Sequence, residues 1–235
     1  MIRINILMLL FLSLSLAAFG QAEIEEVSVT NLSDLNSSNE DFVAVPYDDG
    51  IMYNAIGAKN PCDTCGYLHG MRFAQKKADT DCSFSPSVQV ATAAPLPKKS
   101  NFSAATFSAD GGTMYITRNF KQPGGGDLNE REKKLKIVMA QKNDQGAWTN
   151  FTDVPFNNVD FETAHPALSA DGQTLFFASD RPGGVGKMDI WKVTRQGDTW
   201  GEPINLGAPI NSADNEIFPG LYNGTLYFSS NKAGG

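Results

Sequence analysis

A strand–turn–strand unit that recurs four times constrains the fold of this 235-residue chain more than any other feature. The four turns are Asp49-Gly50, Asp110-Gly111, Asp171-Gly172 and Asn223-Gly224, at intervals of 61, 61 and 52 residues. The runs before them are FVAVPY, FSAATFS, HPALS and FPGLY, and the runs after them are IMYNA, TMYIT, TLFFAS and TLYFSS. These dipeptides favour two-residue hairpin turns. Because one such unit cannot bury both of its faces, its repetition predicts sheets stacked side by side.

The third copy is the most complete and predicts four strands, at Ala164–Ser169, Thr174–Ser179, Asp189–Thr194 and Trp200–Leu206. Pro203 lies inside the fourth of these. A proline cannot donate a ladder hydrogen bond, so this strand is expected at the edge of its sheet. A four-stranded meander that ends in such an edge is typical of one blade of a β-propeller. We therefore expect an all-β fold, a β-propeller of four-stranded antiparallel blades.

The spacing divides residues 21–235 into blades at about 40–99, 100–160, 161–212 and 213–235. Within residues 26–36, the run Val29–Leu32 parallels Ile204–Leu206, so this segment is expected to be a closing strand with no blade before it. The fourth copy stops at Gly235, inside its glycine-rich loop. We therefore expect an incomplete ring of about three and a half blades, an N-terminal fragment, because propellers close with ~4–8 blades.

Two motifs of the third copy resemble a known family. PALSADGQTLFFASDRPGGVGKMDIW at Pro166–Trp191 resembles the TolB-like, WD-repeat-like propeller repeat. WGEPINLGAPINSADNE at Trp200–Glu216 is similar to the version found in OmpA-family envelope proteins of Gram-negative bacteria. The resemblance implies a periplasmic, outer-membrane-associated protein whose propeller engages other envelope proteins. It also implies a further, C-terminal OmpA-like domain that binds peptidoglycan.

The N-terminus has the features of a secretory signal peptide in the right order. Arg3 gives a positive start, Ile6–Ala18 is an apolar or small stretch, and Ala18-Phe19-Gly20 is a small-residue cleavage site. Residues 1–20 are therefore expected to direct export to the periplasm. The apolar run is too short to span a bilayer, and no membrane span is expected. The net charge of −7 argues against nucleic acid or anionic lipid as a partner.

The three cysteines are candidates for special chemistry. In an oxidising compartment Cys62 and Cys65 are expected to form a structural disulfide, with Cys82 as an alternative partner. A zinc site that uses these cysteines and His69 stays open, although a second cysteine pair is missing. A redox role would need a helix after the pair, and the sequence predicts none. We expect no metal and no cofactor.

The sequence has no catalytic motif, because it lacks G-x-S-x-G and H-E-x-x-H and has only two histidines, His69 and His165. His165 adjoins Pro166 at the start of a strand, where a hydrogen-bonded structural role is expected. The loop Gly183–Lys187 departs from the phosphate-binding P-loop, which opens a helix, and is expected to be a glycine turn. The recurring turn aspartates are expected to support the local backbone. No catalytic residue is assigned.

Aromatic residues at alternate strand positions are expected to fill the core between blades. They are Trp148, Trp191, Trp200, Phe176, Phe177, Tyr227 and Phe228. The insertions Ala58–Leu68 and Lys121–Lys134 occupy the same place in their units and are expected to project from one rim, where propellers carry binding sites. Tyr67 and Phe120 are the candidates there for a glycan-binding surface.

These patterns favour a non-catalytic module for protein or cell-wall-associated interaction. A propeller that gates a hydrolase or peptidase encoded further downstream is one alternative, and a glycan-binding propeller is the other. The motif at Trp200–Glu216 favours the envelope family over the hydrolases.

Overall fold

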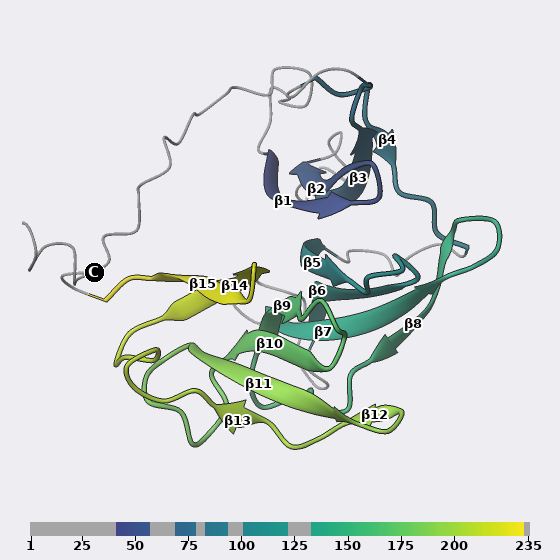
Figure 1. Ribbon diagram of the computed structural model, residues 1–235. Helices are drawn as coiled ribbons and strands as arrows, with labels where there is room; N and C mark the ends of the chain where they lie inside the picture. The colour runs from purple at the N-terminus through teal and green to yellow at the C-terminus, as the bar shows by residue number, and fades with distance from the viewer. Residues whose placement is uncertain (1–40, 57–68, 79–82, 94–100, 122–132, 233–235) are drawn as a thin grey trace, which may run out of the picture. The chain divides into compact units, whose positions relative to one another are not determined.

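The protein folds into short antiparallel β-sheets (Figure 1). The computed structural model describes residues 41–56, 69–78, 83–93, 101–121 and 133–232, which belong to one unit, Ser33–Gly235. Every helix or strand assigned in these ranges is a strand, so the expected all-β class is confirmed. The expected signal peptide and closing strand, Tyr67, the three cysteines and most of both insertions lie outside the described residues.

The strands of the described ranges form four sheets. The first sheet has the order β1 (Asp41–Tyr47), β2 (Gly50–Ile56), β3 (His69–Gln75), β4 (Val88–Gln89). The second has the order β5 (Phe102–Phe107), β6 (Thr113–Lys121), β7 (Lys133–Lys142), β8 (Trp148–Asp153). The third has the order β12 (Thr199–Trp200), β11 (Asp189–Gln196), β10 (Thr174–Ser179), β9 (Thr163–Leu168), and β13 (Ile204–Asn205) also pairs with β11. The fourth is the hairpin of β14 (Glu216–Tyr222) and β15 (Thr225–Ser230).

One predicted strand is divided in two. The run Trp200–Leu206 forms β12 and β13, with Pro203 between them, and each short strand pairs with β11. A proline has no N–H to donate, so the ladder is interrupted there. The segment still lies at the edge of its sheet, as the proline predicts.

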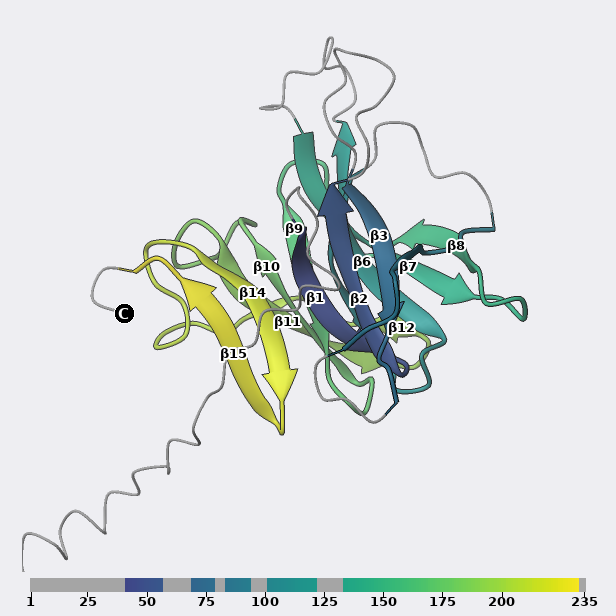
Figure 2. The same cartoon turned by 90° about the horizontal axis from the view of Figure 1, so that it is seen from above.

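The first strands of successive sheets are neighbours. β1 contacts β5, β5 contacts β9, and β9 contacts β14, while the later strands of each sheet lead away from this line of first strands (Figures 1 and 2). Each first strand also shifts its register against the second strand of its sheet. Sheets that repeat side by side in this way give the described residues β-propeller character.

Apolar clusters fill the spaces between sheets. One joins the first and second sheets and includes Tyr47, Met52, Met114, Ile116, Val138 and Trp148. Another joins the second and third sheets and includes Tyr115, Ile137, Leu175, Phe177, Trp191 and Trp200. The three tryptophans and Phe177 are thus buried, as the period-two placement predicts, whereas Phe176 is only half-buried.

Tyr227 and Phe228 correct that prediction. They align with Phe176 and Phe177 of the third sheet, yet they are 56% and 37% exposed. The fourth sheet has two strands in the described residues, and no sheet of those residues lies beyond it (Figure 2). An aromatic side chain at this register is buried only where a neighbouring sheet covers it.

The predicted two-residue turn is wrong at Asp110-Gly111 and at Asp171-Gly172. Both are four-residue loops, closed by hydrogen bonds from Ser108 N to Thr113 O and from Ser169 N to Thr174 O. The aspartate side chain takes part in closing each loop, because it accepts hydrogen bonds from groups on both sides of the turn.

The two outer turns do have two residues. Tyr47 pairs with Gly50, so the first turn consists of Asp48 and Asp49, and Gly50 is the first residue of β2 rather than a turn residue. Asn223-Gly224 is the turn between β14 and β15, and its φ angles of 46° and 75° are those of a type I′ turn.

Candidate functional site

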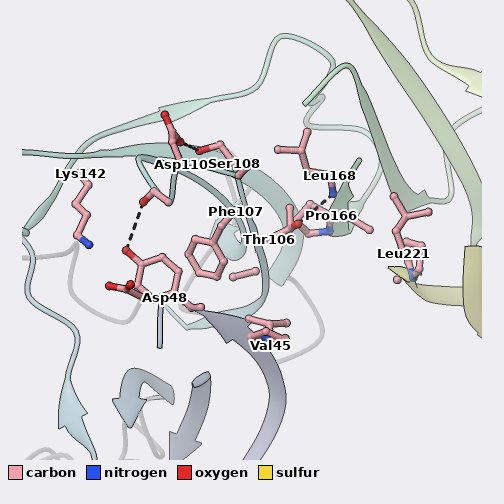
Figure 3. A pocket seen from close by; sticks show the side chains of 18 residues that line it. Val45, Asp48, Thr106, Phe107, Ser108, Asp110, Lys142, Pro166, Leu168 and Leu221 are labelled. Atoms are coloured by element: carbon pink, nitrogen blue, oxygen red, sulfur yellow. Dashed lines mark hydrogen bonds between the residues drawn. The ribbon is translucent and has the colours of Figure 1, made fainter. Parts of the chain in front are cut away.

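A hollow of about 630 Å³ lies between the first strands of the four sheets (Figure 3). Its walls are residues 45–47 of β1, 105–107 of β5, 166–168 of β9 and 219–221 of β14, and its rim is formed by hairpin residues and Lys142. Because four segments far apart in the sequence supply the walls, the hollow exists only when the sheets are stacked.

The walls and the rim of this hollow differ in chemistry. Figure 3 shows the apolar side chains Val45, Phe107, Pro166, Leu168 and Leu221 and the polar side chains Asp48, Ser108, Asp110 and Lys142. Apolar walls with a few convergent polar groups are the usual lining of a ligand site.

Lys142 brings a positive charge to the rim. It is the last residue of β7, and its backbone N–H donates to Gly112 O at 2.9 Å. This hydrogen bond holds the backbone from which the side chain extends. Its Nζ lies 5.2 Å from the centroid of the Tyr47 ring. The interaction with the Tyr47 hydroxyl raises the pKa of Lys142 above its ordinary value, so the ammonium group stays charged at neutral pH.

Asp110 brings a negative charge to the same rim. Ser108 Oγ donates to its carboxylate at 2.5 Å, and Gly112 N donates at 3.0 Å. These two bonds lower the pKa of Asp110, so it is ionised at neutral pH. Asp171 has the same arrangement with Ser169 in the third sheet, and its pKa is lowered for the same reason.

The turn residues noted in the sequence do not form one site. Asp110 and Gly111 line the hollow, and the other turn residues are not part of its lining. Asp49 accepts a hydrogen bond from Gln75 Nε2 at 2.6 Å, so its carboxylate contacts a neighbouring strand rather than its own turn.

Threonine hydroxyls join the second sheet to β9 beside the hollow. Leu168 N donates to Thr106 Oγ1 at 3.1 Å, and His165 N donates to Thr117 Oγ1 at 2.8 Å. β9 is an edge strand of its sheet, so these side chains satisfy N–H groups that its own ladder leaves unpaired. Hydrogen bonds between sheets therefore hold this wall in place.

The described residues do not give the His165 side chain the hydrogen-bonded role that the sequence suggests. Its ring stacks on Phe218 with 3.8 Å between centroids, and the buried Nδ1 has no hydrogen-bond partner among the described residues. Burial lowers the pKa of His165 to about 4, so the imidazole is neutral at pH 7. Within the described ranges no hydroxyl or thiol bonds to this ring, and nothing there marks it as a general base.

The glycine-rich loop after β10 binds a carboxylate of its own sheet. Val185 N and Gly186 N both donate to Asp189, which is 1% exposed. These backbone N–H groups are the ones a phosphate would need, and they are already occupied. The loop is the glycine turn that its sequence predicts.

Arg181 is a buried cation that the sequence analysis missed. It is 8% exposed, and its Nη2 donates to Phe156 O and Thr163 Oγ1, both at 3.2 Å. Its guanidinium also lies 4.8 Å from the centroid of Phe177 and 5.3 Å from that of Trp191. Burial lowers the pKa of Arg181 to about 10, so it remains charged at pH 7. Its position two residues after the end of β10, in Arg-Pro-Gly-Gly, is the sequence signal for it.

No group of three or more His, Cys, Asp or Glu side chains in the described ranges is placed to hold a metal ion. The cysteines and the His69 side chain lie outside those ranges, so the disulfide and the zinc alternative remain predictions. In the part of the chain that the structure describes, no helix has the length and apolar character needed to cross a membrane.

The fold and the site together define an all-β protein of β-propeller character, with a hollow bounded by the first strands of its sheets. The sequence matches no protein-family model, and no curated protein matches it significantly.

Similar solved structures include a puromycin-hydrolysing peptidase of Mycobacterium tuberculosis, at 15% identity and a TM-score of 0.43 over 72% of this chain. A prolyl endopeptidase matches at 18% identity and a TM-score of 0.41 over 78% of the chain. A glycoside hydrolase matches at 12% identity and a TM-score of 0.48, also over 78%. The chain spans 23% of the length of each peptidase and 59% of that of the glycoside hydrolase.

Proposed function

We propose that this protein is a non-catalytic recognition module whose hollow binds a segment of a partner protein. The observation that carries the proposal is the combination of apolar walls with two charges of opposite sign, Asp110 and Lys142, at one rim. The volume of about 630 Å³ lies within the range of known ligand sites.

The strand edges around the hollow suggest what kind of ligand enters it. β1, β5, β9 and β14 each lie at the end of their sheet, with one edge directed away from the rest of it. Edge strands can pair with the main chain of an extended peptide, while apolar pockets receive its side chains. In β9 the N–H groups of His165 and Leu168 already bind threonine hydroxyls, so main-chain pairing there would use other groups. The proposed ligand is therefore an extended segment with apolar side chains and a charged group that faces Asp110 or Lys142.

The proposed setting is the Gram-negative periplasm, in an outer-membrane-associated protein of the OmpA family whose propeller blades include the four sheets. The signal-like residues 1–20 and the envelope-type motif at Trp200–Glu216 support it. Within this motif, Asn211 hydrogen-bonds both the N–H and the C=O of Ile190, at 2.8 and 2.9 Å. Glu216, which is 0% exposed, accepts hydrogen bonds from Ser212 N and Oγ. These motif residues therefore fix the loop between β13 and β14 to its neighbouring strands, and residues elsewhere would determine which ligand binds.

Photo-crosslinking in cells tests the proposal. A benzophenone amino acid replaces Ala109, which is exposed on the rim of the hollow, and in a matched control it replaces Asp198, exposed on the hairpin between β11 and β12. We expect defined protein adducts from Ala109 that disappear when Lys142→Glu and Leu221→Asp are introduced. The same adducts from both positions, or adducts insensitive to those changes, would refute a protein-binding hollow.

A further inference from the structure

Another, smaller pocket lies where the connection between β8 and β9 meets the edge segment of the third sheet. Its volume is about 250 Å³, and it shares no lining residue with the hollow between the first strands. Residues 155–158 and Phe161 form one side, and residues 200–203 form the other. Arg181, which is 8% exposed, lines it as well. A buried cation therefore borders a pocket that two loops make.

Three of the five N–H donors of Arg181 are already used. Nε donates to Ser179 Oγ at 3.0 Å, and Nη2 donates to Phe156 O and Thr163 Oγ1, both at 3.2 Å. A guanidinium has five N–H groups, so the two of Nη1 are left. No described residue accepts a hydrogen bond from Nη1, and this nitrogen is not among the atoms shut off from solvent. Nη1 is therefore the free donor that Arg181 brings to the pocket.

The positive charge of Arg181 is also unpaired among the described residues. Asp180 and Glu202 act on it electrostatically, yet neither forms an ion pair with it. Asp180 Oδ1 accepts a hydrogen bond from Glu162 N at 2.6 Å instead. A buried charge is costly unless an opposite charge and hydrogen bonds compensate it. An anion in the pocket would supply both.

Aromatic rings hold the guanidinium in place and give the pocket apolar surface. The guanidinium carbon lies 4.9 Å from the centroid of Phe161 and 4.8 Å from that of Phe177. Phe156 stacks on Phe177 with 4.9 Å between centroids. Phe156, Phe161 and Trp200 all line the pocket. The free donor is thus presented from a packed position, beside rings that suit an apolar group.

The chemistry of the pocket favours a ligand with one negative charge. Carboxylates are good acceptors for arginine N–H groups. A phosphate carries up to two negative charges, and Glu202, which is exposed on the lining, would repel it more strongly. Asn158 also lines the pocket, and its Oδ1 accepts from Asp160 N at 3.0 Å, which leaves its Nδ2 to donate. The small volume suits an acid group on a short apolar stem rather than a large ligand.

We propose that this pocket is a carboxylate-binding site, in which Arg181 Nη1 donates to the carboxylate of the ligand and the aromatic rings hold its apolar stem. The ligand is a small carboxylic acid or an acidic side chain of a peptide. Because the pocket and the hollow between the first strands have no residue in common, this site does not depend on the function proposed for that hollow.

Fluorine NMR of the full chain labelled with 5-fluorotryptophan tests the site. Trp200 lines the pocket, whereas Trp148 belongs to the core between the first and second sheets and serves as an internal reference. Phenylacetate is titrated at neutral pH and constant ionic strength. We expect the Trp200 resonance to shift saturably with a Kd on the order of 1 mM, typical of a ligand of this size, while the Trp148 resonance stays in place. Phenylacetamide, the neutral analogue, should bind at least about fivefold more weakly, because charge-assisted hydrogen bonds are the stronger ones.

Two variants at exposed lining positions test the site without disturbing the buried arginine. Glu202→Gln removes a repelling charge and should tighten phenylacetate binding roughly two- to fivefold, and Asn158→Asp should weaken it by a similar factor. Asp198→Asn, exposed on the hairpin between β11 and β12 and outside the lining, changes the net charge as Glu202→Gln does and should leave the Kd unchanged. Arg181→Lys keeps the charge but loses the planar set of N–H donors, and it should weaken binding at least about fivefold.

A short capped peptide with one glutamate identifies the source of the carboxylate. Tighter binding by the peptide than by phenylacetate assigns the site to an acidic side chain, and weaker binding assigns it to a free acid; both results support a carboxylate site. An unchanged Trp200 resonance or equal binding of phenylacetate and phenylacetamide overturns the proposal. Equal Kd values for Glu202→Gln and Asp198→Asn also overturn it, because the pocket would then not sense the charge on its own lining.

Discussion

Replacing His165 with phenylalanine should reduce the pH dependence of this protein's stability. The imidazole is 8% exposed, and burial lowers its pKa from 6.5 to about 4. The folded state therefore binds a proton less readily than the unfolded state. Stability is lost as the pH falls below 6.5, and the loss levels off once the pH is below about 4.

The size of this effect follows from the two pKa values. Between about pH 7.5 and about pH 5 the unfolded chain protonates His165 almost fully, whereas the folded chain hardly does so. Proton linkage then gives a loss of about 2 kcal/mol in the free energy of unfolding. Phenylalanine keeps an aromatic ring that can stack on Phe218 but does not titrate, so this contribution disappears.

Urea unfolding of both proteins at the two pH values measures the effect. Other titrating groups contribute equally to both proteins, so the difference between the two pH responses isolates His165. The left-handed φ of 55° strains either residue and cancels in the same comparison. A variant that loses as much stability on acidification as the wild type would show that His165 is not a buried neutral imidazole.

Three further changes test the packing, the sheet interface and the turns by urea unfolding. Phe177→Ala removes a fully buried side chain between the second and third sheets and should cost about 3–5 kcal/mol, and a loss near zero would contradict this core. Arg195→Met removes the hydrogen bond to Tyr115 and should cost about 1–2 kcal/mol, with most of the loss absent in a Tyr115→Phe background. Gly172→Ala places a side chain at a φ of +70° and should cost about 1 kcal/mol. Gly220→Ala should cost much less, because an added Cβ there also meets no atom within 4 Å and the residue has no positive φ. Equal losses for the two variants would contradict the turn geometry.

Local patterns predicted the strands well where the signal lies within a few residues. The predicted second strand of the third unit, Thr174–Ser179, coincides with β10, and the predicted third strand, Asp189–Thr194, begins at the first residue of β11. Both runs lie next to clear turn or loop signals, so these boundaries are set locally. Trp200–Leu206 was predicted as one strand, although Pro203, which cannot donate a ladder hydrogen bond, already marked the place where β12 and β13 are separated.

The sequence also carries a signal for the length of each hairpin loop, but this signal is a serine that lies before the Asp-Gly dipeptide. Ser108 and Ser169 stand two positions before the aspartate in the four-residue loops and donate to its carboxylate. The two-residue turn at Asn223-Gly224 has Leu221 in that place. An Asp-Gly dipeptide alone therefore does not fix the length of the hairpin loop.

The site could not be predicted in the same way, because it depends on contacts between sheets. Nothing near Lys142 in the sequence indicates that it faces Tyr47, almost a hundred residues earlier. The exposure of Tyr227 likewise depends on whether another sheet covers it. An alignment of the units by strand register would have put Lys142 and Arg195 at equivalent positions of the repeat. This shared position is the sequence signal that both cations face a neighbouring sheet.

The most direct test of the proposed hollow compares amide hydrogen exchange of this protein alone with exchange when it is bound to the partner identified by crosslinking. We expect slowed exchange of backbone amides in residues 105–111, 167–168 and 220–221, which line the hollow, with little change in β8 and β12. Slowed exchange confined to the outer strands, with these lining segments unchanged, would contradict a hollow that recognises a protein segment.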